Sequence, residues 1–97
     1  MKIRYNRHVP RDVQEIRNHY ISEAGSTISG EFFDELLRVI EQAAANPRKF
    51  HPDIKDCHRA NLERFPYHFR YRIRNGCIYV LIVKHHKRHP SFGLHRK

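Results

Sequence analysis

The sequence has few cysteines and no long apolar segment. Its 97 residues include only two cysteines, Cys57 and Cys77, and no secretory signal is recognisable at the N-terminus. We therefore expect a reduced, cytoplasmic protein in which both cysteines are small structural residues. No apolar run is long enough to span a bilayer, so we expect a soluble chain without a membrane partner.

Recognisable metal and nucleic-acid motifs are also missing. Nine histidines are present, but His85, His86 and His89 follow an apolar strand and precede a proline, so the helix that their spacing would need is not expected. Zinc-finger spacing, a basic zipper and an aromatic RNA-binding signature are all absent. We therefore expect no metal, no cofactor and no small-molecule substrate.

What is present is positive charge, and it is unevenly distributed. Residues 11–46 hold three Arg and seven acidic residues, whereas residues 47–97 hold thirteen Lys or Arg and three acidic residues. This polarity predicts an anionic partner for the C-terminal half, either nucleic acid or an acidic protein segment. A solvated basic surface is the alternative. We expect a single domain over residues 1–97, with residues 87–97 forming a basic C-terminal tail.

The clearest local pattern is a β-hairpin. Residues 67–74 alternate between large apolar and basic side chains, Asn75-Gly76 suits a two-residue type I′ turn, and residues 77–83 are apolar and β-prone. In this register three pairs share the basic side: Arg74 with Cys77, Arg72 with Tyr79, and Arg70 with Leu81. The opposite, core side is expected to carry Tyr67, Phe69, Tyr71, Ile73, Ile78, Val80 and Ile82.

The remaining elements follow from apolar spacing and punctuation. We expect a strand at residues 2–5, a helix from Pro10 to about residue 24, and a second helix that is capped by Ser26 or Thr27 and stopped at residues 46–47. Residues 47–58 read as a loop anchored by Phe50 and Ile54. The next strand is expected to contain Ala60, Leu62 and Phe65. The fold class is therefore α+β, in the order β-α-α-β-β-β, with an antiparallel helical hairpin packed on one face of a small, mainly antiparallel sheet.

Histidines near arginines also suggest phosphodiester cleavage. The hairpin register would place His68, Arg70, Arg72 and His85 on one face, where His can transfer protons and Arg can stabilise a developing phosphorane. Structural or solvated histidines are the commoner alternative for any one of them.

The order of elements, together with the segments NLERFPYHFRYRI (residues 61–73) and KHHKRHP (residues 84–90), resembles the RelE/ParE superfamily of bacterial toxins. These are the growth-arresting, plasmid-stabilising halves of type II toxin–antitoxin modules. The resemblance covers nearly the whole chain, and it implies a cognate antitoxin as partner.

The superfamily has two mechanisms. RelE-like members cleave mRNA on the ribosome and often carry an Arg three residues before the Tyr that matches Tyr71, where this chain has His68. The corner of Phe65, Pro66 and Tyr67 looks more like ParE-like members, which inhibit DNA gyrase and are not known as nucleases. The resemblance therefore favours a gyrase inhibitor, with a ribosome-dependent endoribonuclease as the alternative and a non-toxic basic RNA-binding module as a more remote one.

Each mechanism implies a set of site residues. A ribonuclease would use His68, His85 and His86 as catalytic groups. The expected target-binding residues are Arg70, Arg72, Arg74, Tyr79, Lys84, Lys87 and Arg88. Whether the chain is an enzyme depends on which mechanism holds.

Overall fold

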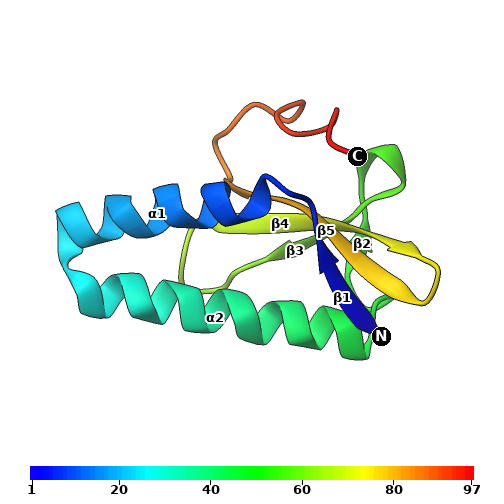
Figure 1. Cartoon of the computed structure of the whole chain (residues 1–97), viewed down its shortest axis with the longest axis horizontal. Coiled ribbons are helices and arrows are strands. Elements are labelled where there is room, and N and C mark those ends of the chain that lie inside the picture. Colours follow the sequence, from blue (N-terminus) through cyan, green and yellow to red (C-terminus); the bar gives the residue numbers. More distant parts are fainter.

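Two helices and a five-stranded sheet make up the structure, a computed structural model that describes all 97 residues (Figure 1). Along the chain the elements are β1 (Lys2–Tyr5), α1 (Val9–Ala24), α2 (Ser26–Ala45), β2 (His51–Pro52), the short 3-10 helix η1 (Ile54–Asp56), β3 (His58–Asn61), β4 (Tyr67–Arg74) and β5 (Cys77–His85). The α+β class and the predicted order are confirmed, with the two-residue β2 as an addition.

A single glycine joins the two helices. Gly25 has a φ of 96°, which residues with a side chain rarely adopt, and its N–H donates to the carbonyls of Tyr20 and Ile21 at 2.9 and 3.2 Å. The chain therefore reverses within one residue, and α2 begins at Ser26 with no side-chain cap. The predicted cap by Ser26 or Thr27 is wrong, because Gly25 already occupies the N-cap position.

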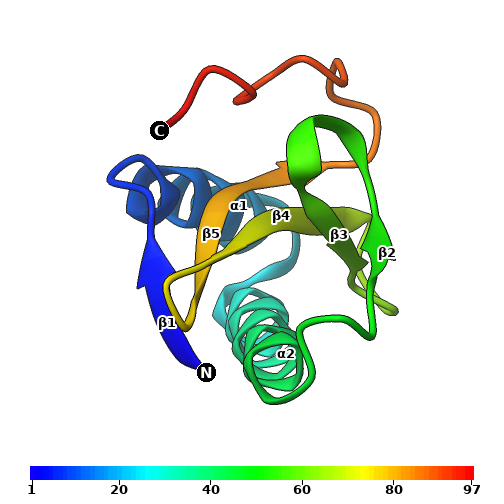
Figure 2. The same cartoon turned by 90° about the vertical axis from the view of Figure 1, so that its right-hand side faces the viewer.

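The strands are arranged in the order β1-β5-β4-β3-β2, with β1 and β2 at the two edges (Figure 2). Strand β1 pairs parallel to β5, and all other neighbours are antiparallel. The predicted hairpin turn is confirmed, since Asn75 and Gly76 have φ values of 51° and 74°. The parallel pairing of β1 places the loop that follows it beside the middle of β5.

The core lies between the helices and one face of the sheet. From α2, Phe32, Leu36 and Ile40 are at most 2% exposed. The sheet contributes fully buried side chains that the alternation predicted: Phe69, Tyr71, Ile78 and Val80. The hydroxyl of Tyr71 donates to the carbonyl of Pro47 at 2.7 Å, so this buried phenol is hydrogen-bonded.

A β-bulge in β5 changes the predicted hairpin register. Tyr71 pairs with Val80, but Arg70 pairs with Ile82, so Leu81 is an extra residue in β5. The predicted pair of Arg70 with Leu81 is therefore wrong. Ile82 lies on the Arg70 side and outside the core cluster, contrary to its predicted place. Residues 77–83 are uniformly apolar, so they carry no alternation that would reveal a bulge.

Two smaller expectations about the segment before β4 are also wrong. Leu62 and Phe65 belong to the core, but they follow the end of β3, and the N–H of Leu62 donates to the carbonyl of Tyr67 at 2.9 Å. Phe50 packs against the core as expected, whereas Ile54 is 41% exposed and anchors nothing. An apolar residue that points into the core from a bend looks the same in a sequence as one from a strand, so the end of β3 could not be located from Leu62 and Phe65.

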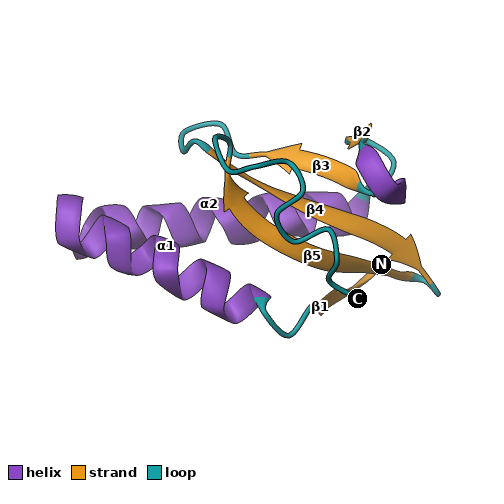
Figure 3. Ribbon diagram, turned by 90° about the horizontal axis from the view of Figure 1, so that it is seen from above, coloured by secondary structure: helices purple, strands orange, loops and turns teal.

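The C-terminal segment, residues 87–97, crosses the sheet on the face away from α2 (Figures 2 and 3). It consists of successive turns, closed by hydrogen bonds from the N–H groups of Phe92, Leu94 and Arg96 to carbonyls three residues earlier. Gly93, with a φ of 85°, lies so close to Ile82 that an added Cβ would be 2.1 Å from its Cδ1 atom. The segment therefore packs tightly on the sheet at this point.

Candidate functional site

The outer face of the sheet, opposite the core, holds most of the predicted site residues. Two rows of side chains cross it through β3, β4 and β5: Arg59, Arg70 and Ile82 in one row, and Asn61, His68 and Lys84 in the next. This face was predicted to be an open basic surface, and at its centre the prediction is wrong. Arg70, Lys84 and His68 are 3%, 4% and 1% exposed. The loop before β3 and the C-terminal segment contact Arg70, the C-terminal segment contacts Lys84, and the ring of His86 stacks on His68.

Arg70 is bound from both sides. Its Nε donates to Oδ2 of Asp53 at 2.7 Å, and its Nη1 donates to the carbonyl of Pro90 at 3.2 Å. Burial raises the pKa of the Asp53 carboxyl, but the hydrogen bond and charge of Arg70 outweigh it and hold that pKa below its ordinary value. Arg70 thus connects the loop before β3 to the C-terminal segment.

Lys84 holds the C-terminal segment with neutral partners. Its Nζ donates to the carbonyls of His89, Pro90 and Phe92 at 3.0, 3.1 and 3.2 Å. Burial, followed by the positive charge of Arg70, lowers the pKa of Lys84 to about 8. The ammonium group satisfies three backbone carbonyls, so it organises the segment instead of facing solvent.

His68 and His86 form a stacked pair. Their rings lie 5.2 Å apart at 11°, and their Nδ1 atoms are 2.9 Å apart. Nη2 of Arg59 lies 3.3 Å from Nδ1 of His86, which makes this nitrogen the acceptor and Nδ1 of His68 the donor. Nε2 of His68 is then the unprotonated nitrogen, and it is buried without a hydrogen-bond partner.

The surroundings of this pair disfavour the charged imidazole. Burial, then the charges of Arg59 and Arg70, lower the pKa of His68 to about 3. The pKa of His86 is also lowered, by burial and by the charge of Arg59. His68 is therefore neutral at pH 7.

His85 does not join this pair on the outer face. The bulge at Leu81 places it opposite Tyr67, on the helix-facing side, where the two rings meet edge to face at 5.0 Å. The prediction that His85 shares a face with His68 is therefore wrong. Its Nδ1 accepts a hydrogen bond from the N–H of Lys87 at 3.0 Å, which turns the chain into the C-terminal segment.

The other predicted target-binding residues are more accessible. Arg74 is exposed, and Arg72 is half-buried with Nε donating to the carbonyl of Lys55 at 3.3 Å. Tyr79 is half-buried, and its hydroxyl donates to the main-chain oxygen of Lys97 and accepts from Nδ2 of Asn6. These residues lie towards the hairpin turn, away from His68.

Lys87 and Arg88 begin the C-terminal segment and are exposed. The guanidinium carbon of Arg88 lies 3.9 Å from the ring centroid of Phe92, so this charge stacks on an aromatic face of the same segment. The arrangement leaves both residues at the surface, where they can contact a macromolecule.

An ion pair that sequence reasoning missed fixes the far end of the segment. Nη1 and Nη2 of Arg96 donate to both carboxylate oxygens of Asp12, at 2.6 and 2.9 Å, and Asp12 also accepts the N–H of Val83 at 3.2 Å. Nη1 of Arg96 donates further to the carbonyl of Leu81. The pair thus occupies the edge of β5 beyond its pairing with β1. Asp12 is an ordinary acidic residue for the first turn of a helix, and Arg96 is one of thirteen Lys or Arg residues in the C-terminal half, so no sequence signal marks the pair.

A second missed feature is an apolar groove between the helices and β1. It is a hollow of about 400 Å³ with seven hydrophobic residues among the ten that line it: Tyr5, Val9, Pro10, Val13, Gln14, Arg17, Phe33, Leu36, Leu37 and Ile40. Tyr5 and Leu37 are 45% and 38% exposed, unusually high values for large apolar side chains in this chain. The available sequence signal was the broad apolar face of α2, which includes Phe33 and Leu37 beside the core residues Leu36 and Ile40.

The cysteines and histidines do not assemble into a ligand set. No group of three or more His, Cys, Asp or Glu is placed to hold a metal ion. Cys57 and Cys77 are both buried and free, and burial raises the pKa of the Cys57 thiol.

Comparisons with known proteins bear on both the fold and the role. The sequence model of a family described as the ParE toxin of the type II toxin–antitoxin system parDE matches residues 3–90. A solved structure from the chromosomal ParDE toxin–antitoxin system of P. aeruginosa matches with a TM-score of 0.79 and 19% identity, covering 88% of this chain and 95% of that one. A search of curated proteins gave no match. Neither helix is long and apolar enough to cross a membrane.

Proposed function

The chain belongs to the ParE toxin family of type II toxin–antitoxin systems, and we propose that it arrests growth by inhibiting DNA gyrase. The observation that carries this proposal is the family match over residues 3–90. Family membership implies an antitoxin partner, and the resemblance to ParE-like toxins implies gyrase as the target.

The state of the histidines supports the gyrase inhibitor over the ribonuclease. General acid–base catalysis is most efficient when the pKa lies near the working pH. His68 has a pKa of about 3 and is 1% exposed, so neither its proton affinity nor its access suits proton transfer on RNA. His85 lies on the other side of the sheet, so the three predicted catalytic histidines do not share one face.

We assign the target contacts to the members of the predicted set that remain accessible, which are the half-buried Arg72 and the exposed Arg74, Lys87 and Arg88. Arg70 and Lys84 would act indirectly, because their donors already hold the C-terminal segment. Substitution of one accessible cation should therefore weaken gyrase inhibition by degrees. Substitution of Arg70 or Lys84 should instead disturb the structure of the C-terminal segment.

The antitoxin is assigned to the apolar groove between the helices and β1. Its lining is mostly hydrophobic, and Lys2, Arg4 and Arg7 lie in and just after the strand at its edge. An amphipathic antitoxin segment with acidic flanks would bury the exposed faces of Tyr5 and Leu37 and pair with these cations. No other hollow of this size is as apolar.

The test compares two assays on the same purified chain. We expect inhibition of supercoiling by purified gyrase and intact mRNA in a translation extract. Arg74→Ala and Arg88→Ala should each weaken inhibition several-fold, whereas Arg38→Ala, an equal charge change among acidic residues of α2 and the 63–64 bend, should not. Cleaved mRNA that His86→Ala protects, with gyrase unaffected, would show that the ribonuclease alternative is correct.

A further inference from the structure

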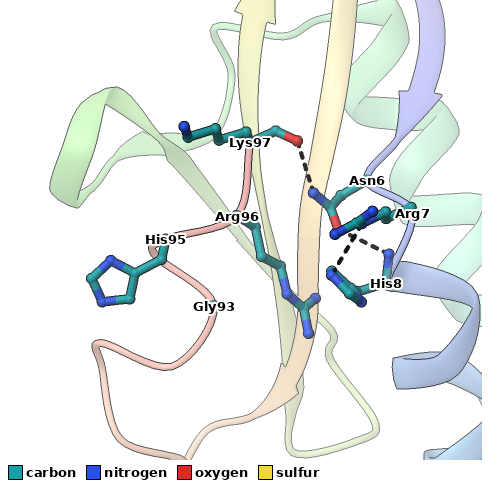
Figure 4. A pocket seen from close by; sticks show the side chains of 7 residues that line it. All are labelled: Asn6, Arg7, His8, Gly93, His95, Arg96 and Lys97. Carbon is teal, nitrogen blue, oxygen red and sulfur yellow. Dashed lines mark hydrogen bonds between the residues drawn. The ribbon is translucent and has the colours of Figure 1, made fainter.

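A polar hollow lies between the start of α1 and the C-terminal segment. It has a volume of about 490 Å³, and none of its seven lining residues is hydrophobic. Figure 4 shows that they come from residues 6–8 on one side and from the C-terminal segment on the other. Five of them are basic: Arg7, His8, His95, Arg96 and Lys97.

A second hollow adjoins the first at Lys97. It has a volume of about 370 Å³ and is lined by Arg4, Arg74, Asn75, Cys77, Tyr79 and Lys97. The two are joined by hydrogen bonds, since Nδ2 of Asn6 donates to the hydroxyl of Tyr79 at 3.2 Å and to the main-chain oxygen of Lys97 at 2.9 Å. Together they form a continuous surface, the basic strip, from the hairpin turn to the start of α1.

The basic strip contains positive charge that forms no ion pair within the chain. Arg4, Arg7, Arg74 and Lys97 are exposed, and none takes part in the three ion pairs of the structure. Only Arg96 is neutralised, by Asp12. Neither hollow is lined by an Asp or Glu side chain, whereas the hollow beside α2 is lined by four: Glu31, Asp34, Glu35 and Glu63. The basic strip and the hollow beside α2 therefore differ sharply in the side-chain charge that lines them.

We propose that the basic strip binds the phosphate backbone of nucleic acid without reading its sequence. Guanidinium groups match phosphate oxygens, and a row of them neutralises successive phosphates along a strand. An acidic protein segment would pair with the same cations. However, the first hollow offers no hydrophobic residue on which an amphipathic peptide could dock, so phosphate chemistry is favoured. The start of α1, whose N-cap His8 forms no side-chain cap, adds a partial positive charge at the same hollow.

This property goes beyond gyrase inhibition and does not depend on it, because the binding partner is the nucleic acid itself. Neutralising about three phosphates makes the logarithm of the binding constant fall with the logarithm of salt concentration with a slope of about −3. We therefore expect dissociation constants of about 10⁻⁴ to 10⁻⁶ M near physiological salt, typical of sequence-independent binding.

The experiment measures fluorescence anisotropy of labelled oligonucleotides titrated with the full chain at several salt concentrations. Two unrelated duplex DNA sequences and one single-stranded RNA form separate arms, which identify the preferred source of phosphate. Arg4→Ala, Arg7→Ala and Arg74→Ala combined should weaken binding at least 30-fold and bring the slope close to zero. All three residues are exposed, so their replacement should leave the fold intact, and circular dichroism checks it.

The matched control replaces cations of equal charge elsewhere. Arg38→Ala, Arg48→Ala and Arg11→Ala combined should keep most of the affinity, because none of these residues lines either hollow. Equal losses in both triple variants would overturn the assignment to the basic strip. Binding to polyglutamate but to none of the three nucleic acids would overturn it in favour of an acidic protein. Because the assay contains no gyrase, neither result bears on the proposed toxin activity, which is tested separately.

Discussion

His68 lies among positive side chains, which disfavour a charge on its own imidazole. It pairs across the sheet with Lys84, and Arg59 and Arg70 lie one row away. Its only hydrogen-bond partner is the imidazole of His86. A protonated His68 would be a buried cation among other cations, so the neutral form is a condition of the fold at this position.

This condition makes stability depend on pH. Between the folded pKa of about 3 and the ordinary value of 6.5, the unfolded chain binds a proton at this histidine and the folded chain does not. The free energy of unfolding should therefore rise with pH across this interval, by at most about 1.4 kcal/mol per pH unit from His68. Above pH 6.5 this contribution is complete and constant.

Denaturant unfolding from pH 4 to 7 checks the prediction. His68→Asn keeps a donor near Nδ1 but cannot titrate, and it should show a clearly flatter dependence than the unmodified chain. His95→Asn, which changes an exposed imidazole in the C-terminal segment, is the control and should keep the original slope. Identical slopes in all three proteins would contradict the role assigned to His68.

Among the elements, the C-terminal segment is held by side chains and not by strand pairing. Its side-chain hydrogen bonds to the rest of the chain include those of Lys84 with three carbonyls, of Arg70 with one, of Arg96 with Asp12 and Leu81, and of Asn6 and Tyr79 with the main-chain oxygen of Lys97. Lys84 and Arg70 share the carbonyl of Pro90, whereas Arg96 fixes the far end of the segment. Local opening of such a segment requires less free energy than global unfolding, because few apolar contacts break.

We therefore expect Arg96→Ala to loosen the segment selectively. Hydrogen exchange at the protected amides of Phe92, Leu94 and Arg96 should accelerate at least tenfold, while amides in β4 and β5 stay protected, apart from Val83, which donates to Asp12. Lys87→Ala removes an equal charge from an exposed position in the same segment and should change nothing. Unchanged exchange in the Arg96 variant would mean that the ion pair does not hold the segment.

The elements themselves were predictable where local chemistry specifies them. Alternation and Asn75-Gly76 located the hairpin, and Gly25 located the end of α1. The bulge at Leu81 was not predictable, because a uniformly apolar strand has no apolar–polar alternation whose interruption would reveal an extra residue. That single residue moved Ile82 to the outer face and His85 off it. That the C-terminal segment covers Arg70 and Lys84 on the outer face was also not predictable, since a sequence does not distinguish buried cations from solvated ones.

At the scale of the whole molecule, charge and apolar surface are separated in space. The acidic hollow lies beside α2, the basic strip runs from the hairpin turn to the start of α1, and the apolar groove opens between the helices and β1. Arg4 and Arg7 lie where the basic strip meets the edge of the groove, so these two surfaces adjoin, whereas the acidic hollow shares no lining residue with either.

Inducible expression in bacterial cells tests the toxin assignment most directly. The chain alone should arrest growth, and co-expression of its antitoxin should restore it. Leu37→Glu, in the groove, should arrest growth even with the antitoxin, because a charge replaces the apolar contact. Ile21→Glu, at a similarly exposed apolar position on α1 outside the groove, should remain neutralised. Normal growth of cells that accumulate the unmodified chain in folded form, without any antitoxin, would contradict the account.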